Sequence, residues 1–175
     1  MTQIVTAIDE LPSSIGHTVV QKDSHGGSVT IASGGDLTIE GSFSGSITIE
    51  SGGKVTIKGS SRGKVINRGE LKIEGKLDGD CDNYGEYELI GRHDGKSLVL
   101  KAGSTSIIKG EGEVDLTAEP NSKLEVSPNA SLSSSGGNDN EAIVNGGAIA
   151  IGGGNVAHSL QSTGSVVFTG NSVFK

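Results

Sequence analysis

The sequence predicts an all-β protein, a single-stranded parallel β-helix (β-solenoid) with coils of roughly 16–18 residues. Three observations predict it: 29 glycines in 175 residues, apolar residues that alternate with polar ones, and similar blocks that follow one another. Alternation with period two is typical of strands, and short repeated blocks gain stability only by stacking on their neighbours. Aromatic residues make up 3% of the chain, so Val, Ile and Leu must form the core.

Four consecutive blocks carry the repeat. They are LTIEGSFSGSITIESGGK (37–54), VTIKGSSRGKVINRGE (55–70), LKIEGKLDGDCDNYGE (71–86) and YELIGRHDGKSLVLKAGS (87–104). Each opens on alternating apolar residues and continues with a G-x-x-x-G pair, because glycine tolerates the backbone of sharp corners. The outer two blocks are longer than the middle two by an even number of residues, which keeps inward and outward positions in step.

The remaining chain divides around these blocks. We expect the regular solenoid to cover 28–132, with 105–135 as degenerate copies, and 1–27 to form a cap or arm in which TAIDELP makes one or two helical turns. The polar stretch 133–141 predicts a loop. The glycine-rich, apolar segment 142–175 either continues the solenoid or packs across its end. Its apolar residues Phe168, Val173 and Phe174 are our candidates for an assembly interface.

Aligning the blocks places residues in columns along the solenoid. Asn67 falls over Asn83 at an inward position, which predicts an asparagine ladder, because an inward amide persists only when it is hydrogen-bonded. Cys81 falls in an aliphatic inward column and is expected to be a small core residue. Outward columns alternate in charge, as in Lys54 with Glu70, and opposite charges on neighbouring strands attract modestly.

Three aspartates at alternate positions, Asp78, Asp80 and Asp82, are the best candidates for a metal or catalytic site. Carboxylates on one outward face could hold calcium. The columns, however, place lysines on both sides of Asp80 and an arginine beside Asp78, so we expect a charge-paired surface. Asp82 is the exception, because its expected neighbours, Ile66 and Leu98, offer no cation.

Other signals of chemistry are weak. His17, His25, His93 and His158 have no ligand-like spacing, and GGAIAIGGGN lacks the G-K-[ST] ending of a phosphate-binding loop. No nucleophile motif stands out, so we expect no cofactor and no enzymatic activity.

Charge and hydropathy limit the partners and the compartment. A net charge of −7 argues against nucleic acid as a partner. The sequence has neither a signal peptide nor an apolar run near the roughly 18 residues that span a bilayer. We therefore expect a cytoplasmic protein without a transmembrane segment. Secretion without a cleaved signal, or a place in a virion, would leave no trace in the sequence.

The segments VTIKGSSRGKVIN and LKIEGKLDGDCDN resemble the bactofilin family of bacterial polymer-forming proteins, over roughly residues 29–110. The resemblance implies a right-handed β-helix that polymerises end to end without a nucleotide. The chain departs from that pattern in two ways. Coils after 105 lose the glycine pair, and the C-terminal tail is long and apolar.

The leading hypothesis is therefore a non-enzymatic scaffold or filament subunit that self-associates through the ends of its solenoid. The alternative is a monomeric or oligomeric binding or inhibitory module, of phage or adhesin type, whose acidic face engages a basic protein. A carbohydrate-active enzyme on a β-helix fits least, because short coils lack long loops and aromatic platforms.

Overall fold

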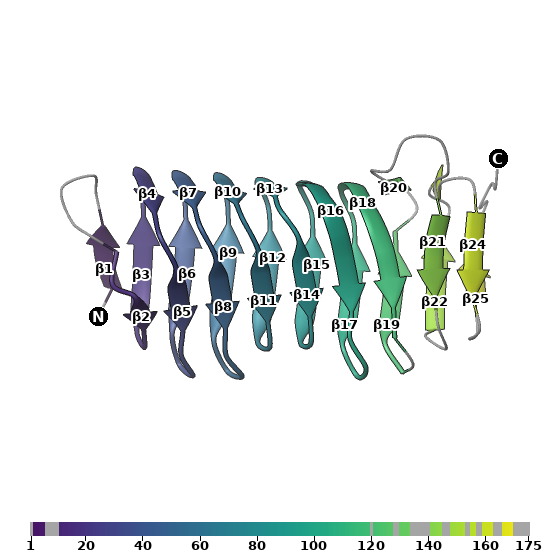
Figure 1. Cartoon of the computed structure of the whole chain (residues 1–175), viewed down its shortest axis with the longest axis horizontal. Helices are drawn as coiled ribbons and strands as arrows, with labels where there is room; N and C mark the ends of the chain where they lie inside the picture. Colours follow the sequence, from purple (N-terminus) through teal and green to yellow (C-terminus); the bar gives the residue numbers. More distant parts are fainter. Residues whose placement is uncertain are drawn as a thin grey trace.

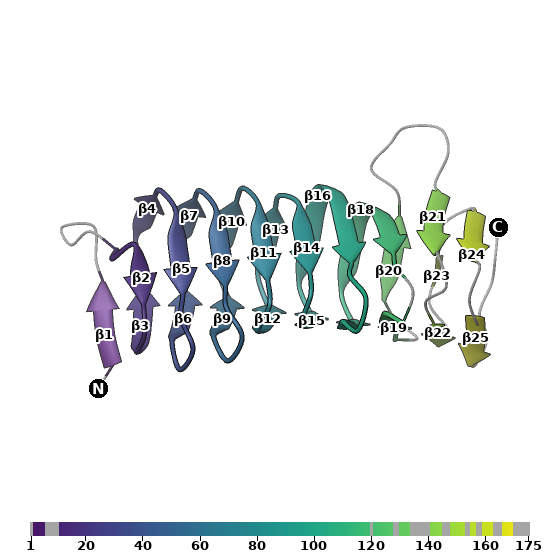
Figure 2. The same ribbon diagram turned by 60° about the horizontal axis from the view of Figure 1, so that its bottom comes forward.

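The structure is a computed structural model of the chain. It describes residues 2–5, 11–119, 121–127 and 130–133, and the strands at 141–144, 148–152, 155–156, 159–162 and 166–169. Strands and turns account for this part of the chain, and it contains no helix. The strands stack along one axis, with β1 and β25 at opposite ends of the stack (Figures 1 and 2). The predicted parallel β-solenoid is confirmed.

The strands form two sheets in which every pairing is parallel. The ten-stranded sheet contains, in order, β1 (Thr2–Val5), β3 (Thr18–Gln21), β6 (Asp36–Ile39), β9 (Lys54–Ile57), β12 (Glu70–Ile73), β15 (Glu86–Leu89), β17 (Thr105–Ile108), β19 (Lys123–Val126), β22 (Ala148–Gly152) and β25 (Val166–Thr169). The fifteen-stranded sheet contains β2 (Ser14–Ile15), β4 (Ser24–Gly26), β5 (Val29–Ile31), β7 (Ser42–Ser44), β8 (Ile47–Ile49), β10 (Ser60–Arg62), β11 (Val65–Asn67), β13 (Lys76–Asp78), β14 (Cys81–Asn83), β16 (Arg92–Leu100), β18 (Glu111–Ala118), β20 (Ser131–Ser133), β21 (Glu141–Val144), β23 (Asn155–Val156) and β24 (Ser159–Ser162).

Each middle coil contributes one strand to the ten-stranded sheet and two shorter strands to the other, as β9, β10 and β11 do. A glycine corner separates the two shorter strands. A Cβ at Gly79 in this corner would lie 2.0 Å from the carbonyl oxygen of Gly63 in the coil before, so only glycine fits. Beyond β15, the strands β16 and β18 run unbroken through that corner.

The core is a single stack of apolar side chains inside the coils. One column contains Leu37, Val55, Leu71 and Tyr87, which pair in register and are buried, as the alignment of the blocks implies. The columns around Ile57 and Val65 behave in the same way. Each coil thus buries its inward residues against the coils above and below it, as a solenoid requires.

The expected length of the fourth block is wrong. Its boundaries at 87 and 104 place Tyr87 opposite Thr105, but Thr105 pairs with Glu86 and Tyr87 pairs with Ser106, so the coil is one residue longer. The additional residue forms a β-bulge between Asp94 and Ser97, where the register shifts. An even block length cannot be assumed, because the bulge absorbs the odd residue and restores the alternation of side chains.

The two ends of the chain also contribute strands to the sheets. β1 to β4, within the segment expected as a cap or arm, pair with each other or with the following coil. Most of TAIDELP lies outside the described residues. In the C-terminal segment, β22 and β25 extend the ten-stranded sheet, and β21, β23 and β24 extend the other.

From β2 to β19, the corners that lead into the ten-stranded sheet are of two kinds. Long corners have four residues, as between β8 and β9, and the fourth N–H donates to the first carbonyl, with Gly53 N to Glu50 O at 2.8 Å. Their third residue has positive φ, +80° at Gly52 and 64° at Asn121. Short corners have two residues, Arg68–Gly69 after β11 and Tyr84–Gly85 after β14. The coil that closes with the long corner before β9 is therefore longer than the next one, which closes with a short corner.

Candidate functional site

The three aspartates do not converge on one site. Asp78 ends β13, Asp82 lies in β14, and the glycine corner turns the chain between them. A shallow hollow of about 380 Å³ lies over this corner, above Gly63, Gly79 and Gly95, and its acidic lining is Asp78, Asp80 and Asp94 rather than Asp82. The expectation that Asp78, Asp80 and Asp82 share an outward face is therefore wrong.

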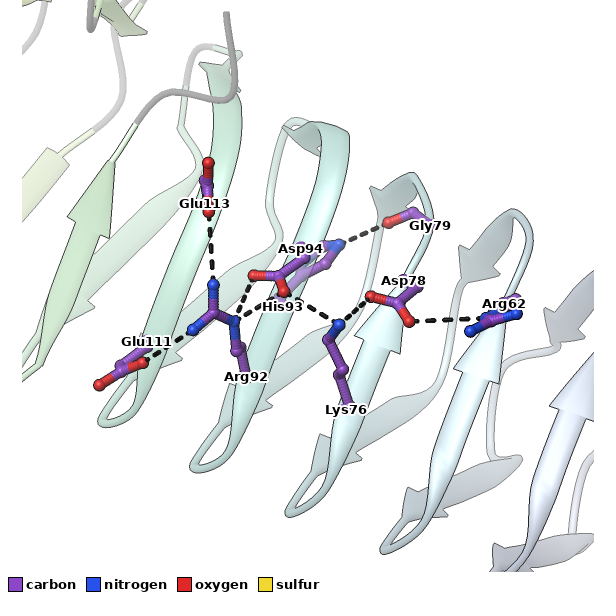
Figure 3. A network of polar contacts seen from close by, with 9 residues as sticks. All are labelled: Arg62, Lys76, Asp78, Gly79, Arg92, His93, Asp94, Glu111 and Glu113. Atoms are coloured by element: carbon purple, nitrogen blue, oxygen red, sulfur yellow. Dashed lines mark hydrogen bonds and ion pairs between the residues drawn. The ribbon is translucent and has the colours of Figure 1, made fainter.

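Asp78 belongs to a ladder of ion pairs that crosses four coils (Figure 3). Its carboxylate lies 3.6 Å from Nε of Arg62 and 2.7 Å from Nζ of Lys76. Lys76 also reaches Asp94, at 3.2 Å, and Arg92 bonds Asp94 at 2.7 Å. The predicted pairing of Arg62 with Asp78 is confirmed, and the cations leave little of this carboxylate for a ligand.

Arg92 ends the ladder by reaching two glutamates of the next coil, Glu111 and Glu113, at 3.4 Å each. Burial alone would raise the pKa of Asp94, but hydrogen bonds from Arg92 and Lys76 outweigh it, and the pKa is lowered. The Asp94 carboxylate is therefore held in its charged form. Such exposed pairs stabilise the stack by only a fraction of a kcal/mol each, about 0.2–1 kcal/mol.

Asp80 has a structural role that the sequence did not indicate. Its Oδ1 accepts hydrogen bonds from the backbone N–H groups of Lys96 at 2.9 Å and Ser97 at 3.0 Å. These residues form the bulge of β16, where an additional residue interrupts the pairing of backbone groups. Asp80 therefore replaces the partners that the bulge removes.

Asp82 has the cationic partner that we did not expect. Lys64 Nζ lies 2.6 Å from its Oδ2, and this hydrogen bond is the main reason that the pKa of Lys64 is raised. Its neighbour in β16 is Val99 rather than Leu98, because the bulge moves the register by one residue. The expectation that Asp82 lacks a cationic partner is therefore wrong.

The predicted asparagine ladder is confirmed. Asn67 Nδ2 donates to Asn83 Oδ1 at 2.8 Å, and Asn83 Nδ2 donates to Oγ of Ser106 at 3.0 Å. Each side-chain oxygen also accepts the N–H of the short-corner glycine two residues later, at 3.1 Å for Gly69 and 3.2 Å for Gly85. The ladder therefore supplies the hydrogen bonds of the short corners.

The core contains three ionisable groups near one level of the stack. Cys81 is fully buried, as predicted, and burial raises the pKa of its thiol, so the reactive thiolate is disfavoured. His93 Nε2 lies 2.6 Å from the carbonyl oxygen of Gly79, and Nδ1 lies 2.8 Å from Oη of Tyr87. A carbonyl only accepts, so Nε2 carries a proton. Burial lowers the pKa of His93, which favours the neutral ring, and in that ring Nδ1 accepts from the Tyr87 hydroxyl.

Possible metal ligands do not gather in the described part of the chain. No group of three or more His, Cys, Asp or Glu side chains there could hold a metal ion. His17 bonds Gln3, at 2.9 Å between Nε2 and Oε1, whereas His93 is buried in the core. His158 lies outside the described residues.

A second hollow, of about 320 Å³, lies on the outer face of the ten-stranded sheet over β6, β9, β12, β15 and β17. We call it the sheet trough. Two columns of outward side chains border it, and its charged lining is Asp36, Lys54, Glu70, Lys72, Glu86 and Glu88.

Comparisons with known proteins leave the geometry as the basis for function. A scan against protein-family models and searches of curated proteins and of solved structures find no match to this chain. Within the described residues, no helix has the length and apolar character needed to cross a membrane. Of the expected interface residues, Phe168 lies in β25, in register with Ile151, whereas Val173 and Phe174 lie outside the described residues.

Proposed function

We propose that this protein is a non-enzymatic structural protein, a β-solenoid that self-associates end to end into filaments or a larger scaffold. The observation that carries the proposal is the arrangement of the edge strands. β1 and β25 are the outermost strands of the ten-stranded sheet in the described part of the chain, at opposite ends of the rod (Figure 1). An edge strand presents unpaired backbone N–H and C=O groups that a strand of another chain can satisfy.

The parallel arrangement makes the two ends compatible. β1 and β25 run in the same direction, since every pairing in the sheet is parallel, so β25 of one copy can stack on β1 of the next and continue the ladder. Such a head-to-tail contact does not close on itself and gives an open filament. The resemblance of residues 29–110 to the bactofilins supports the same function, because it implies a polymer-forming family.

The surface chemistry of the middle coils supports a structural function over catalysis. Asp78 and Asp82 are engaged by cations, and Asp80 holds backbone groups of the bulge. His93 and Cys81, which could carry acid–base or nucleophilic chemistry, are buried. The best-placed reactive groups thus stabilise the coils.

Negative-stain microscopy of the purified chain tests the proposal. We expect filaments or rods several times longer than one molecule, which spans about 43 Å over nine strand-to-strand steps of about 4.8 Å. Phe174→Arg should shorten them while far-UV circular dichroism stays unchanged. Lys175→Arg is the matched control and should assemble normally. Dispersed monomers at every salt and protein concentration would contradict the proposal.

A further inference from the structure

The sheet trough has room and exposed apolar groups between two columns of side chains. The first column contains Asp36, Lys54, Glu70 and Glu86, which pair in register across β6, β9, β12 and β15. The second contains Thr56 and Ile107, both partly exposed, with two charged residues between them. The residues between the columns, such as Leu71, point into the core. The floor of the trough is therefore mostly backbone.

The charges of the trough do not balance. Lys54 pairs with Glu70 at 2.7 Å, Lys72 pairs at 2.8 Å with Glu74, which directly follows β12, and Lys109 pairs with Glu88 at 2.6 Å. Within the described part of the chain, these pairs leave the carboxylates of Asp36 and Glu86 without a salt bridge.

Glu86 also lies directly opposite Glu70 on the neighbouring strand, an arrangement of like charges that destabilises a sheet. The pKa of Lys54 is raised, mainly by its hydrogen bond to Glu70 and further by Asp36 and Glu86. Like charges therefore gather around this ammonium, and an additional cation would offset them.

The spacing of the two free carboxylates defines what fits. Asp36 and Glu86 lie three strand-to-strand steps apart, about 14 Å. An extended peptide covers about 14 Å in four residues, and residues i and i+4 point to the same side of it. Two lysines four residues apart could thus reach both carboxylates. Their aliphatic stems and the residues between them would cover the backbone floor and the partly exposed Thr56.

We propose that the sheet trough binds an extended basic segment of a partner protein, lying along the solenoid axis, with two cationic side chains four residues apart on Asp36 and Glu86. The site lies on a side of the rod, so it stays accessible when copies stack end to end and does not depend on that assembly. The sheet trough would be the acidic face in the alternative function, a binding module that engages a basic protein. Because the contacts are exposed ion pairs, the binding is weak and decreases with salt.

Fluorescence anisotropy with two labelled peptides of equal composition tests this proposal on the full chain. The first, GKTSTKG, has its lysines four residues apart, and the second, GKTSKTG, has them three apart and on opposite sides. We expect the first to bind at low ionic strength and the second to bind at least threefold more weakly. Equal binding of the two peptides, or no binding of either, would overturn the proposal.

Matched variants locate the site. Glu86→Gln should weaken GKTSTKG by about fivefold, the upper end for one exposed ion pair, and adding Asp36→Asn should weaken it further. Glu40→Gln removes the same charge from an exposed corner beyond the trough and should leave the affinity unchanged. Equal losses for Glu86→Gln and Glu40→Gln would overturn the proposal, because they would indicate attraction to net charge alone. Displacement by spermine at the same charge concentration would also overturn it, since a peptide would then not be required.

Discussion

Two kinds of corner connect the same two sheets, and each satisfies the backbone in its own way. A long corner closes with its own hydrogen bond, such as Ser104 N to Lys101 O at 3.0 Å, and places a residue with positive φ at its third position. A short corner has no room for that turn, so an inward asparagine accepts the N–H of the corner glycine. The inward asparagine and the two-residue length of the corner therefore occur together in the sequence.

The inward residue before each corner follows this difference. Ile49 and Leu100 precede long corners, whereas Asn67 and Asn83 precede short ones. A third two-residue corner, Gly16–His17, follows Ile15 without an asparagine. It lies in the first coil, where Gly16 is exposed and a Cβ on it would meet nothing within 4 Å. The asparagine is needed where the corner is stacked between coils.

The largest effect is expected from glycine replacements that separate packing from backbone conformation. A Cβ at Gly85 would lie 2.2 Å from the carbonyl oxygen of Gly69, so Gly85→Ala should destabilise the protein by about 3 kcal/mol. Gly103 has φ of +81° but open space around it, so Gly103→Ala should cost only about 1 kcal/mol. Urea unfolding followed by circular dichroism measures both. Similar losses would show that short corners are not tightly stacked.

Replacing the ladder asparagine should cost slightly less. Asn83→Leu copies the residue before the next corner. It leaves Gly85 N without its acceptor and Asn67 Nδ2 with only the carbonyl of Glu86, at about 2 kcal/mol in total. Inserting Ser-Gly between Tyr84 and Gly85 converts the corner to the long kind and should recover most of the loss. The same insertion beside the native Asn83 is the control and should not stabilise. If the insertion fails to rescue Asn83→Leu, the asparagine is not required by the short length of the corner, and the proposed link between the two would be wrong.

Low pH should destabilise the protein through the buried His93. Burial lowers the pKa of His93 below the value near 6.5 of an unfolded chain. Above pH 6.5 the histidine is neutral in both the folded and the unfolded chain. Below pH 6.5 the histidine of the unfolded chain binds a proton, whereas the buried His93 of the folded chain stays neutral. The free energy of unfolding therefore decreases as the pH falls. Melting temperatures between pH 7.5 and 5.5 measure this loss. Tyr87→Phe combined with His93→Leu removes the proton acceptor and should make the melting temperature depend less on pH. An unchanged pH dependence would contradict the view that His93 causes the loss of stability in acid.

The smallest effect is expected from the ion-pair ladder. Lys76→Met removes the contacts to Asp78 and Asp94 and should lower the stability less than any of the changes above at 0.1 M salt, because exposed ion pairs contribute little. At 1 M salt the difference should nearly vanish, because exposed charges are screened. Lys22→Met, an exposed lysine in the first complete coil, serves as the control for lost charge. A salt-independent loss would mean that the alkyl stem of Lys76, rather than its charge, stabilises the stack.

The repeat made the fold predictable, and it also predicted the asparagine ladder, because aligned blocks are neighbours in space. It could not predict the bulge at Asp94–Ser97, since one inserted residue does not change the pattern of the flanking strands. The partners of Asp80 and Asp82 follow from that bulge and from a diagonal reach of Lys64, which register alone does not give. The contact between Tyr87 and His93 was missed because the two residues lie on different faces of one coil.

Fibre diffraction from aligned assemblies tests the central claim most directly. The strands lie across the rod and are about 4.8 Å apart along its axis. End-to-end stacking therefore predicts a strong reflection at about 4.8 Å on the meridian, parallel to the filament. The same reflection on the equator would mean that the rods associate side by side, and it would contradict assembly through the solenoid ends.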